Sequence, residues 1–175
     1  MTNVLIIGAT GTIGSAVRQT LLDQTDDQLT LFSRSAGRLS IDSSREKAIS
    51  GSVTNDADLD KALQGQDVVF AALSGNLGNF DDHIVKAMDR NGVKRLLFIT
   101  SMGIYNEIPA SVGASGNLKN NPILQTYRDA ADVIEASDLN YTIIRPGWFT
   151  SGPVNYEVTH KGQPFGGHNV SVSSI

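Results

Sequence analysis

The sequence predicts an α/β protein with a doubly wound, mostly parallel sheet in a three-layer α/β/α arrangement. Three observations carry this prediction. The apolar run Val4–Ile7 leads directly into a glycine-rich turn, a helical pattern follows the turn, and strand-like and helix-like segments alternate through the rest of the chain. Alternation of this kind is typical of parallel strands joined by helical crossovers. Because there is neither an internal repeat nor a linker, we expect residues 1–175 to form a single domain.

The glycine-rich turn, Gly8–Gly14, reads Gly-Ala-Thr-Gly-Thr-Ile-Gly. In a Rossmann fold the first glycine allows a tight turn, the second lets a pyrophosphate approach the backbone, and the third packs helix against strand. The free N–H groups and the dipole of the first helical turn favour an anion. Because Ile13, Val17 and Leu21 recur at helical spacing, we interpret the stretch as a dinucleotide-binding turn. The alternative is a strand–helix turn that binds nothing.

The other elements follow from apolar periodicity and from the residues that interrupt it. Helices are expected at 56–63, around 80–91 and at 122–138, with acidic residues opening the first and Asn91-Gly92 closing the second. The glycine-rich stretch that ends at Asn121 is long for a loop in a compact domain, and such loops are usually functional or mobile. Strands are expected at 28–33, 47–51, 68–73, 94–100 and 140–145.

The residues that follow the second strand indicate the type of dinucleotide. An acidic residue about 20 positions after the glycines usually binds the ribose 2′-hydroxyl of NAD, whereas an arginine accommodates the 2′-phosphate of NADP. This chain has Ser33-Arg34-Ser35 there and no carboxylate. A guanidinium beside two hydroxyls suits a dianionic phosphate, so NADP, with NADPH favoured over NADH, is the predicted cofactor. The alternative is an arginine on a solvated loop.

Composition excludes several classes of function. The net charge of −4 argues against sequence-independent nucleic-acid binding, which needs clustered Lys and Arg. The absence of cysteine rules out a disulfide framework and a thiolate nucleophile. The apolar runs are too short to span a bilayer, and no basic leader is present, so we expect no membrane partner and a cytoplasmic location.

The sequence also gives no sign of a metal site. His83, His160 and His168 lack ligand spacing. Asp56, Asp58 and Asp60 are not followed by the glycine and closing glutamate of a calcium loop, so helix N-terminal charge explains them better.

The tail changes character after Trp148. We expect residues 148–175 to be a partial, substrate-side C-terminal segment in which Val154–Thr159 and Asn169–Ser173 pair as two strands. The sequence stops at Ile175 within a strand-like pattern, and an α/β domain seldom ends so abruptly.

Together these residues resemble the atypical short-chain dehydrogenase/reductase proteins, in the NAD(P)-binding, NmrA-like branch. The resemblance covers nearly the whole chain. It rests on the glycine turn, Gln66-Asp67-Val68-Val69-Phe70, Phe98-Ile99-Thr100-Ser101, and Tyr141-Thr142-Ile143-Ile144-Arg145-Pro146-Gly147. These motifs are specific for fold and cofactor and say little about substrate.

The resemblance implies a set of site residues. Along the cofactor it places Gly8, Thr10, Gly11, Thr12, Ile13 and Gly14 at the pyrophosphate, Ser33 and Arg34 at the 2′-phosphate, and Ala72, Leu73 and Ser74 at the ribose. Thr100, Ser101, Pro146 and Gly147 are expected near the nicotinamide, with Met102, Trp148 and Phe149 bordering the substrate pocket. Ser101 and Tyr127 are the catalytic candidates.

The chain departs from the wider superfamily at the catalytic Tyr-x-x-x-Lys pair, in which the lysine lowers the pKa of the tyrosine. Tyr127 lies in the expected helix, but the fourth residue after it is Ala131, and Pro109 stands at that spacing from Tyr105. One interpretation is an NADPH-dependent reductase of a small acceptor, such as a quinone, flavin or carbonyl compound. The other is a non-catalytic NADP(H) redox sensor acting through a homodimer or a regulatory protein partner. Sugar epimerases of this superfamily use the Tyr/Lys pair, which disfavours that activity.

Overall fold

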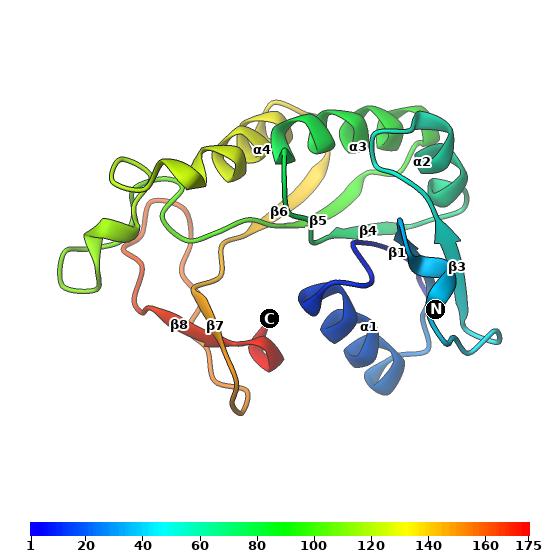
Figure 1. The fold of residues 1–175 in the computed structure, drawn as a ribbon, viewed down its shortest axis with the longest axis horizontal. Helices are drawn as coiled ribbons and strands as arrows, with labels where there is room; N and C mark the ends of the chain where they lie inside the picture. The colour runs from blue at the N-terminus through cyan, green and yellow to red at the C-terminus, as the bar shows by residue number, and fades with distance from the viewer.

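A computed structural model describes all 175 residues and contains a six-stranded, entirely parallel sheet (Figure 1). The strand order is β3-β2-β1-β4-β5-β6, and the reversal at β1 and β4 is that of a doubly wound fold. The strands are β1 (Asn3–Ile7), β2 (Gln28–Ser33), β3 (Glu46–Ser50), β4 (Val68–Ala71), β5 (Arg95–Ile99) and β6 (Asn140–Ile144).

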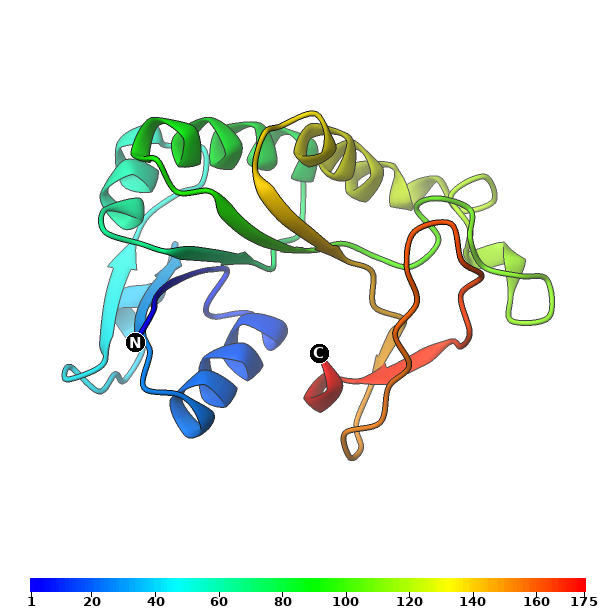
Figure 2. The ribbon, with the colours of Figure 1, turned by 180° about the vertical axis from the view of Figure 1, so that it is seen from behind.

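Helices cover the two faces of the sheet unequally. Helix α1 (Thr12–Gln24) lies on one face, whereas α2 (Asp56–Leu63), α3 (Leu77–Asn91) and α4 (Gln125–Glu135) lie on the other, as Figures 1 and 2 show. The predicted three-layer architecture is therefore confirmed. No helix has the length and apolar character needed to cross a membrane.

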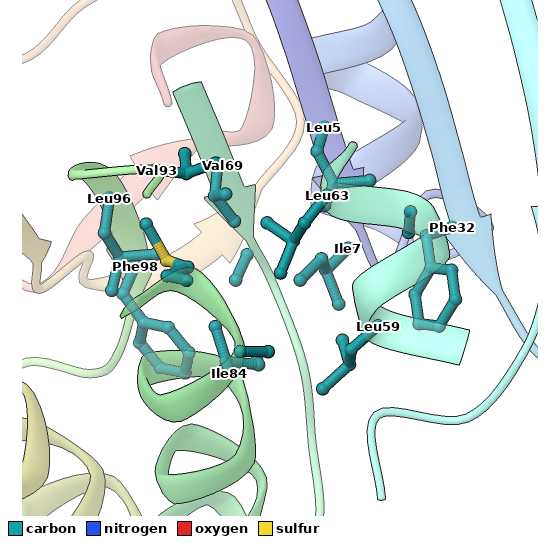
Figure 3. Close-up of a cluster of buried hydrophobic side chains, with 14 of the residues drawn as sticks. Leu5, Ile7, Phe32, Leu59, Leu63, Val69, Ile84, Val93, Leu96 and Phe98 are labelled. Carbon is teal, nitrogen blue, oxygen red and sulfur yellow. The ribbon is translucent and has the colours of Figure 1, made fainter. Parts of the chain in front are cut away.

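The two main clusters of the core lie on opposite faces of the sheet because successive strand residues point to opposite faces. Leu5 and Ile7 of β1 join a cluster under α2, α3 and α4, several members of which Figure 3 shows. Val4 and Ile6 join a second cluster with residues of α1. The turn at Val172–Ser174 brings the end of the chain against this second cluster.

The helix ends agree with the signals in the sequence. The Asn55 side chain accepts a hydrogen bond from the Asp58 N–H and caps α2, with Asp56 and Asp58 in its first turn. Gly92 ends α3 in the left-handed conformation, at a φ of 69°. Arg45 reaches the C-terminal end of α1 and donates to the carbonyls of Leu21 and Leu22.

The structure corrects the expected pairing in the tail. Residues 154–159 form no strand, and β8 (Asn169–Ser171) instead pairs in parallel with β7 (Trp148–Thr150). The Trp148 N–H donates to the His168 carbonyl at 2.7 Å. Alternation of valine with polar residues imitates a strand at 154–159, but the chain there meets no strand edge and stays exposed.

The long loop between β5 and α4 is packed rather than open. Met102, Ile104 and Ile108 are buried, and the buried Asn117 amide makes two hydrogen bonds to the backbone of Ile108, at 2.9 and 2.8 Å. Gly103 has a φ of +86°, and a Cβ there would lie 2.3 Å from the Gly116 carbonyl oxygen. The loop therefore has a defined internal structure.

Candidate cofactor site

The glycine turn has no room for side chains at its first and last positions. Gly8 has a φ of +86°, and a Cβ there would lie 2.1 Å from the Ala72 carbonyl oxygen. A Cβ on Gly14 would lie 2.3 Å from the Gly8 carbonyl oxygen. Gly8 therefore lets the turn after β1 lie against the end of β4, and Gly14 lets α1 pack against that turn.

The start of α1 leaves its backbone donors available. Gly11 is the N-cap and supplies no side-chain hydrogen bond, while Thr12 in the first turn is exposed. The first N–H groups of a helix have no partner within the helix, so an anion can accept them. The Ile13 side chain is buried in the core, which leaves only its backbone to face a ligand.

Beside the turn, the end of β2 presents hydroxyls and a guanidinium. The Thr10 hydroxyl donates to the Ser33 hydroxyl at 3.3 Å, which ties the glycine turn to β2. Arg34 is exposed and forms no hydrogen bond or ion pair with any residue of the chain. Of the other arginines in this region, Arg45 is occupied at the end of α1 and Arg38 lies outside the cavity. Arg34 is therefore the free cation beside the turn.

A cavity of about 520 Å³ lies at the carboxyl ends of β1, β2, β3 and β4. This is the edge at which doubly wound sheets bind their ligands. The cavity brings together the predicted residues Gly8, Thr10, Gly11, Ser33, Arg34, Ala72, Leu73 and Ser74. Its lining also includes residues that the sequence did not single out, namely Gly51, Ser52, Val53, Thr54 and Phe80. The signal for the first four was their position directly after β3.

Thr100 and Ser101, at the end of β5, lie outside this cavity. Thr100 is 3% exposed, and both its N–H and its hydroxyl donate to the Ile144 carbonyl, at 2.8 and 3.0 Å. Its side chain thus joins β5 to β6. Ser101 is half-buried, and its hydroxyl donates to the Met102 carbonyl at 3.1 Å. The cofactor and catalytic roles assigned to these residues stay predictions.

The residues predicted to lie near the nicotinamide and the substrate have different surroundings. Pro146 and Gly147 line a second cavity, at the end of β6. A Cβ on Gly147 would lie 2.4 Å from the His168 carbonyl oxygen, so this glycine is needed for the tail to approach. Met102 is buried in the loop, whereas Trp148 and Phe149 are exposed on β7, and none of the three lines either cavity.

Tyr127 is half-buried, and its hydroxyl has no hydrogen-bond partner in the chain. It packs against the cluster under α3 and α4, while Ala131 is fully buried beside it. The adjacent Arg128 pairs with Asp132 at 2.6 Å, as the helix spacing predicts. The helix therefore supplies no cation to Tyr127.

Tyr105 lies in a cluster of charged groups that the sequence did not reveal. Its hydroxyl donates to Glu135 at 2.6 Å, and Lys161 of the tail donates to the same carboxylate oxygen at 2.6 Å. Arg128 and Arg145 also lie over the Tyr105 ring, 4.7 and 5.1 Å from its centroid. Burial and the bond to Glu135 raise the pKa of Tyr105, so this hydroxyl is a poor acid. Only the fold brings these residues together, because no spacing connects Lys161 with position 105.

The sheet order, the glycine turn and the cavity at the strand ends define a Rossmann-fold protein with a dinucleotide-type site. Residues 8–175 match the family described as NAD(P)H-binding, and the chain belongs to this family.

Solved structures support the same class. A short-chain dehydrogenase/reductase from Veillonella parvula in complex with NADP is 31% identical, with a TM-score of 0.90 over 99% of this chain and 82% of that one. A Rossmann-fold NAD(P)-binding family protein from Shigella flexneri is 38% identical, with a TM-score of 0.83 over 99% of this chain and 82% of that one.

Among curated proteins, a (4-alkanoyl-5-oxo-2,5-dihydrofuran-3-yl)methyl phosphate reductase from Streptomyces griseus is 25% identical over 153 residues. The match covers 87% of this chain, and the chain spans half the length of that relative.

Proposed function

We propose that the protein is an NADP(H)-dependent reductase of a small acceptor, such as a quinone, flavin or carbonyl compound. The observation that carries the cofactor assignment is Arg34, an exposed guanidinium without a partner at the end of β2, in a cavity that contains no carboxylate. A carboxylate there would repel a 2′-phosphate, whereas a guanidinium with neighbouring hydroxyls attracts it. The NADP complex of the Veillonella parvula relative supports this choice.

The residues of this site fit the cofactor. The absence of side chains at Gly8 and Gly14 keeps the turn close to β4 and to α1, and the first turn of α1 offers N–H donors to a pyrophosphate. Ala72, Leu73 and Ser74 would flank the ribose, and Ser33 and Arg34 would hold the 2′-phosphate. When bound, NADPH supplies a hydride. The task of the chain is to hold the nicotinamide and the acceptor in line for this transfer.

Neither Tyr127 nor Tyr105 is suited to donate the proton that the reduction consumes. Tyr127 has no cation beside it to lower its pKa, since Ala131 replaces the lysine. The Tyr105 hydroxyl is bound to Glu135, and its pKa is raised. The acceptors that fit this arrangement are those whose reduction can take its proton from solvent, such as quinones and flavins. The reductase activity in the name of the Streptomyces griseus relative favours a reductase, without indicating the acceptor.

Binding of the two cofactors tests the proposal directly. NADPH and NADH are titrated while the fluorescence of Trp148, the single tryptophan, is followed. We expect NADPH to bind more tightly, and Arg34→Ala to weaken NADPH alone by about 1–3 kcal/mol. Arg38→Ala is the matched control, because Arg38 is exposed in the same loop but lies outside the cavity. Equal affinity for both cofactors would overturn the assignment.

A second candidate is an NADP(H) redox sensor of the NmrA-like type, acting through a homodimer or another protein partner. The observation that favours it is Ala131, which is fully buried at the position of the catalytic lysine of the wider superfamily. The two candidates differ in turnover. Oxidation of NADPH with a panel of quinones, flavins and aldehydes supports the reductase, whereas tight cofactor binding without any turnover supports the sensor.

A further inference from the structure

The second cavity has a volume of about 690 Å³. Of the residues that line it, only Pro146 and Gly147 are among the site residues predicted from the sequence. It lies between the carboxyl-terminal half of β6 and residues 151–168, which we call the strap. Figure 2 shows the strap leaving β7, rising beside the loop that precedes α4, and returning to β8. The strand β6 ends at the same edge of the sheet as the strands around the cofactor cavity. Pro146 and Gly147, which the family resemblance places near the nicotinamide, line this second cavity.

Two contacts hold the strap against the body of the protein. Lys161 donates to the Glu135 carboxylate of α4 at 2.6 Å, and the Phe165 N–H donates to the Glu107 carbonyl at 3.1 Å. Tyr105 donates to the same carboxylate as Lys161, which links the strap to the loop after β5. The outer wall of the cavity is therefore anchored at both α4 and this loop.

The two basic side chains Arg145 and Lys161 are paired with carboxylates, whereas Glu157 has no partner. Arg145 lines the cavity, but its guanidinium lies 2.7 Å from the Glu107 carboxylate in a pair that is largely buried. Lys161 is paired with Glu135. Glu157 lines the cavity without a hydrogen-bond or ion-pair partner, and its carboxylate lies against Gly166, 2.7 Å from where a Cβ would be. The free charge of the cavity is therefore a carboxylate.

The rest of the lining is mixed. Apolar surface comes from Phe165, which is half-buried, and from Tyr156 and Val158, which are 61% and 66% exposed. His160 provides an imidazole that can form a hydrogen bond. A bound acceptor can thus cover this exposed apolar surface and still meet a polar group. A phosphate or carboxylate would face Glu157 and find no unpaired cation, which costs affinity.

We propose that this cavity is the acceptor site, and that Glu157 selects neutral, quinone-type acceptors against anionic ones. The inference rests on the proposed reductase function. In the reaction a quinone takes a hydride from NADPH and a proton from solvent, and it yields the hydroquinone and NADP⁺. The acceptor class differs from that of the Streptomyces griseus relative, whose name describes a phosphate ester.

The experiment compares 1,4-naphthoquinone with 1,4-naphthoquinone-2-sulfonate, which share a ring system and differ in charge. Binding to the NADP⁺-loaded protein is measured by equilibrium dialysis, and NADPH oxidation is measured separately. We expect at least tenfold tighter binding of the neutral quinone. Glu157→Gln should reduce this ratio about threefold and Glu157→Lys more strongly. Asp26→Asn, an equal charge change at an exposed aspartate in the turn before β2, should leave it unchanged.

The results separate the inference from the proposed function. Loss of discrimination in the Glu157 variants, with the Asp26 control unaffected, supports the inference even if no quinone is reduced, in which case only the reductase proposal fails. The inference is overturned, and the reductase proposal stands, if the neutral quinone is reduced but Glu157→Lys leaves the ratio of neutral to anionic quinone binding unchanged. A Tyr156→Ala variant that binds 1,4-naphthoquinone as tightly as the parent protein would also overturn it.

Discussion

Arg18 of α1 forms two hydrogen bonds with Glu46 of β3, and the Glu46 carboxylate that it neutralises is almost completely buried. The second of these bonds is 2.8 Å long. Glu46 also accepts the Asp42 N–H, so one carboxylate joins the helix, the strand and the loop before it. The hydrogen bond from Arg18 and that from the Asp42 backbone outweigh burial and lower the pKa of Glu46.

We expect Arg18→Met to destabilise the fold by about 2–4 kcal/mol, because it leaves a buried carboxylate without its partner. The lowered pKa gives the sign of the pH dependence. The pair stabilises the native state above the ordinary pKa of a glutamate, and this stabilisation is lost as the pH falls through the folded-state value. Urea unfolding at pH 7 and pH 3.5 measures both effects, and the difference between the proteins should shrink at pH 3.5.

Arg90→Met is the matched control for this prediction. Arg90 is exposed and pairs with Asp60 at 3.0 Å on the surface between α2 and α3. Exposed ion pairs contribute about 0–1 kcal/mol, so this variant should lose little stability. An equal loss in the two variants would contradict the role assigned to the buried pair.

The first glycine of the turn should be irreplaceable for two separate reasons. Gly8→Ala forces a side chain into a φ of +86° and places a Cβ 2.1 Å from the Ala72 carbonyl oxygen. We expect a loss of about 3–5 kcal/mol and of NADPH binding, since strain and overpacking each cost about 1–3 kcal/mol. Gly65→Ala has a comparable φ of +72° with no atom within 4 Å, and it should cost only about 1–2 kcal/mol. Thermal unfolding distinguishes the two.

Asp81 gives a pH dependence of opposite sign. It lies on the buried face of α3, both of its carboxylate oxygens lack hydrogen bonds, and burial raises its pKa from 3.8 to about 8. Below pH 3.8 the aspartate is protonated in both states and costs nothing extra. As the pH rises toward 8, only the unfolded chain releases the proton, so native stability is lost.

Asp81→Asn keeps the shape and removes the titration. We expect it to be as stable as the parent protein at pH 3.5 and more stable by a few kcal/mol at pH 8. Asp82→Asn, at the exposed neighbouring position, should show no such trend. Urea unfolding across this pH range measures the difference, and a gap that stays constant with pH would show that Asp81 is charged in the native state.

The sheet and its helices could be predicted because their signals are local. Apolar runs of strand length, Asn91-Gly92 after α3 and the glycines of the first turn each act within a few residues. The shared cavity of the residues after β1, β2 and β4 could be anticipated for the same reason, since the fold places the ends of these strands at one edge.

Contacts between distant segments could not be predicted in this way. Residues 154–159 alternate as a strand does, yet whether a strand forms depends on an available edge, and β8 pairs with β7 instead. Lys161 reaches Glu135 and the ring of Tyr105 only because the strap crosses to α4. No spacing in the sequence encodes that crossing, so the charged cluster and the second cavity became visible only in the structure.

Gly147 should control the attachment of the tail. Its φ needs no glycine, but a Cβ would lie 2.4 Å from the His168 carbonyl oxygen, which accepts the Trp148 N–H. Gly147→Ala should therefore separate β7 from β8 and increase hydrogen exchange of residues 148–150 and 169–171 by about tenfold or more, because local pairing sets that protection. Gly167→Ala meets no atom within 4 Å and should exchange as the parent protein does. Faster exchange spread through α1–α4 would mean instead that the substitution unfolds the whole protein, and unchanged exchange at 148–150 would show that the tail does not depend on this close approach.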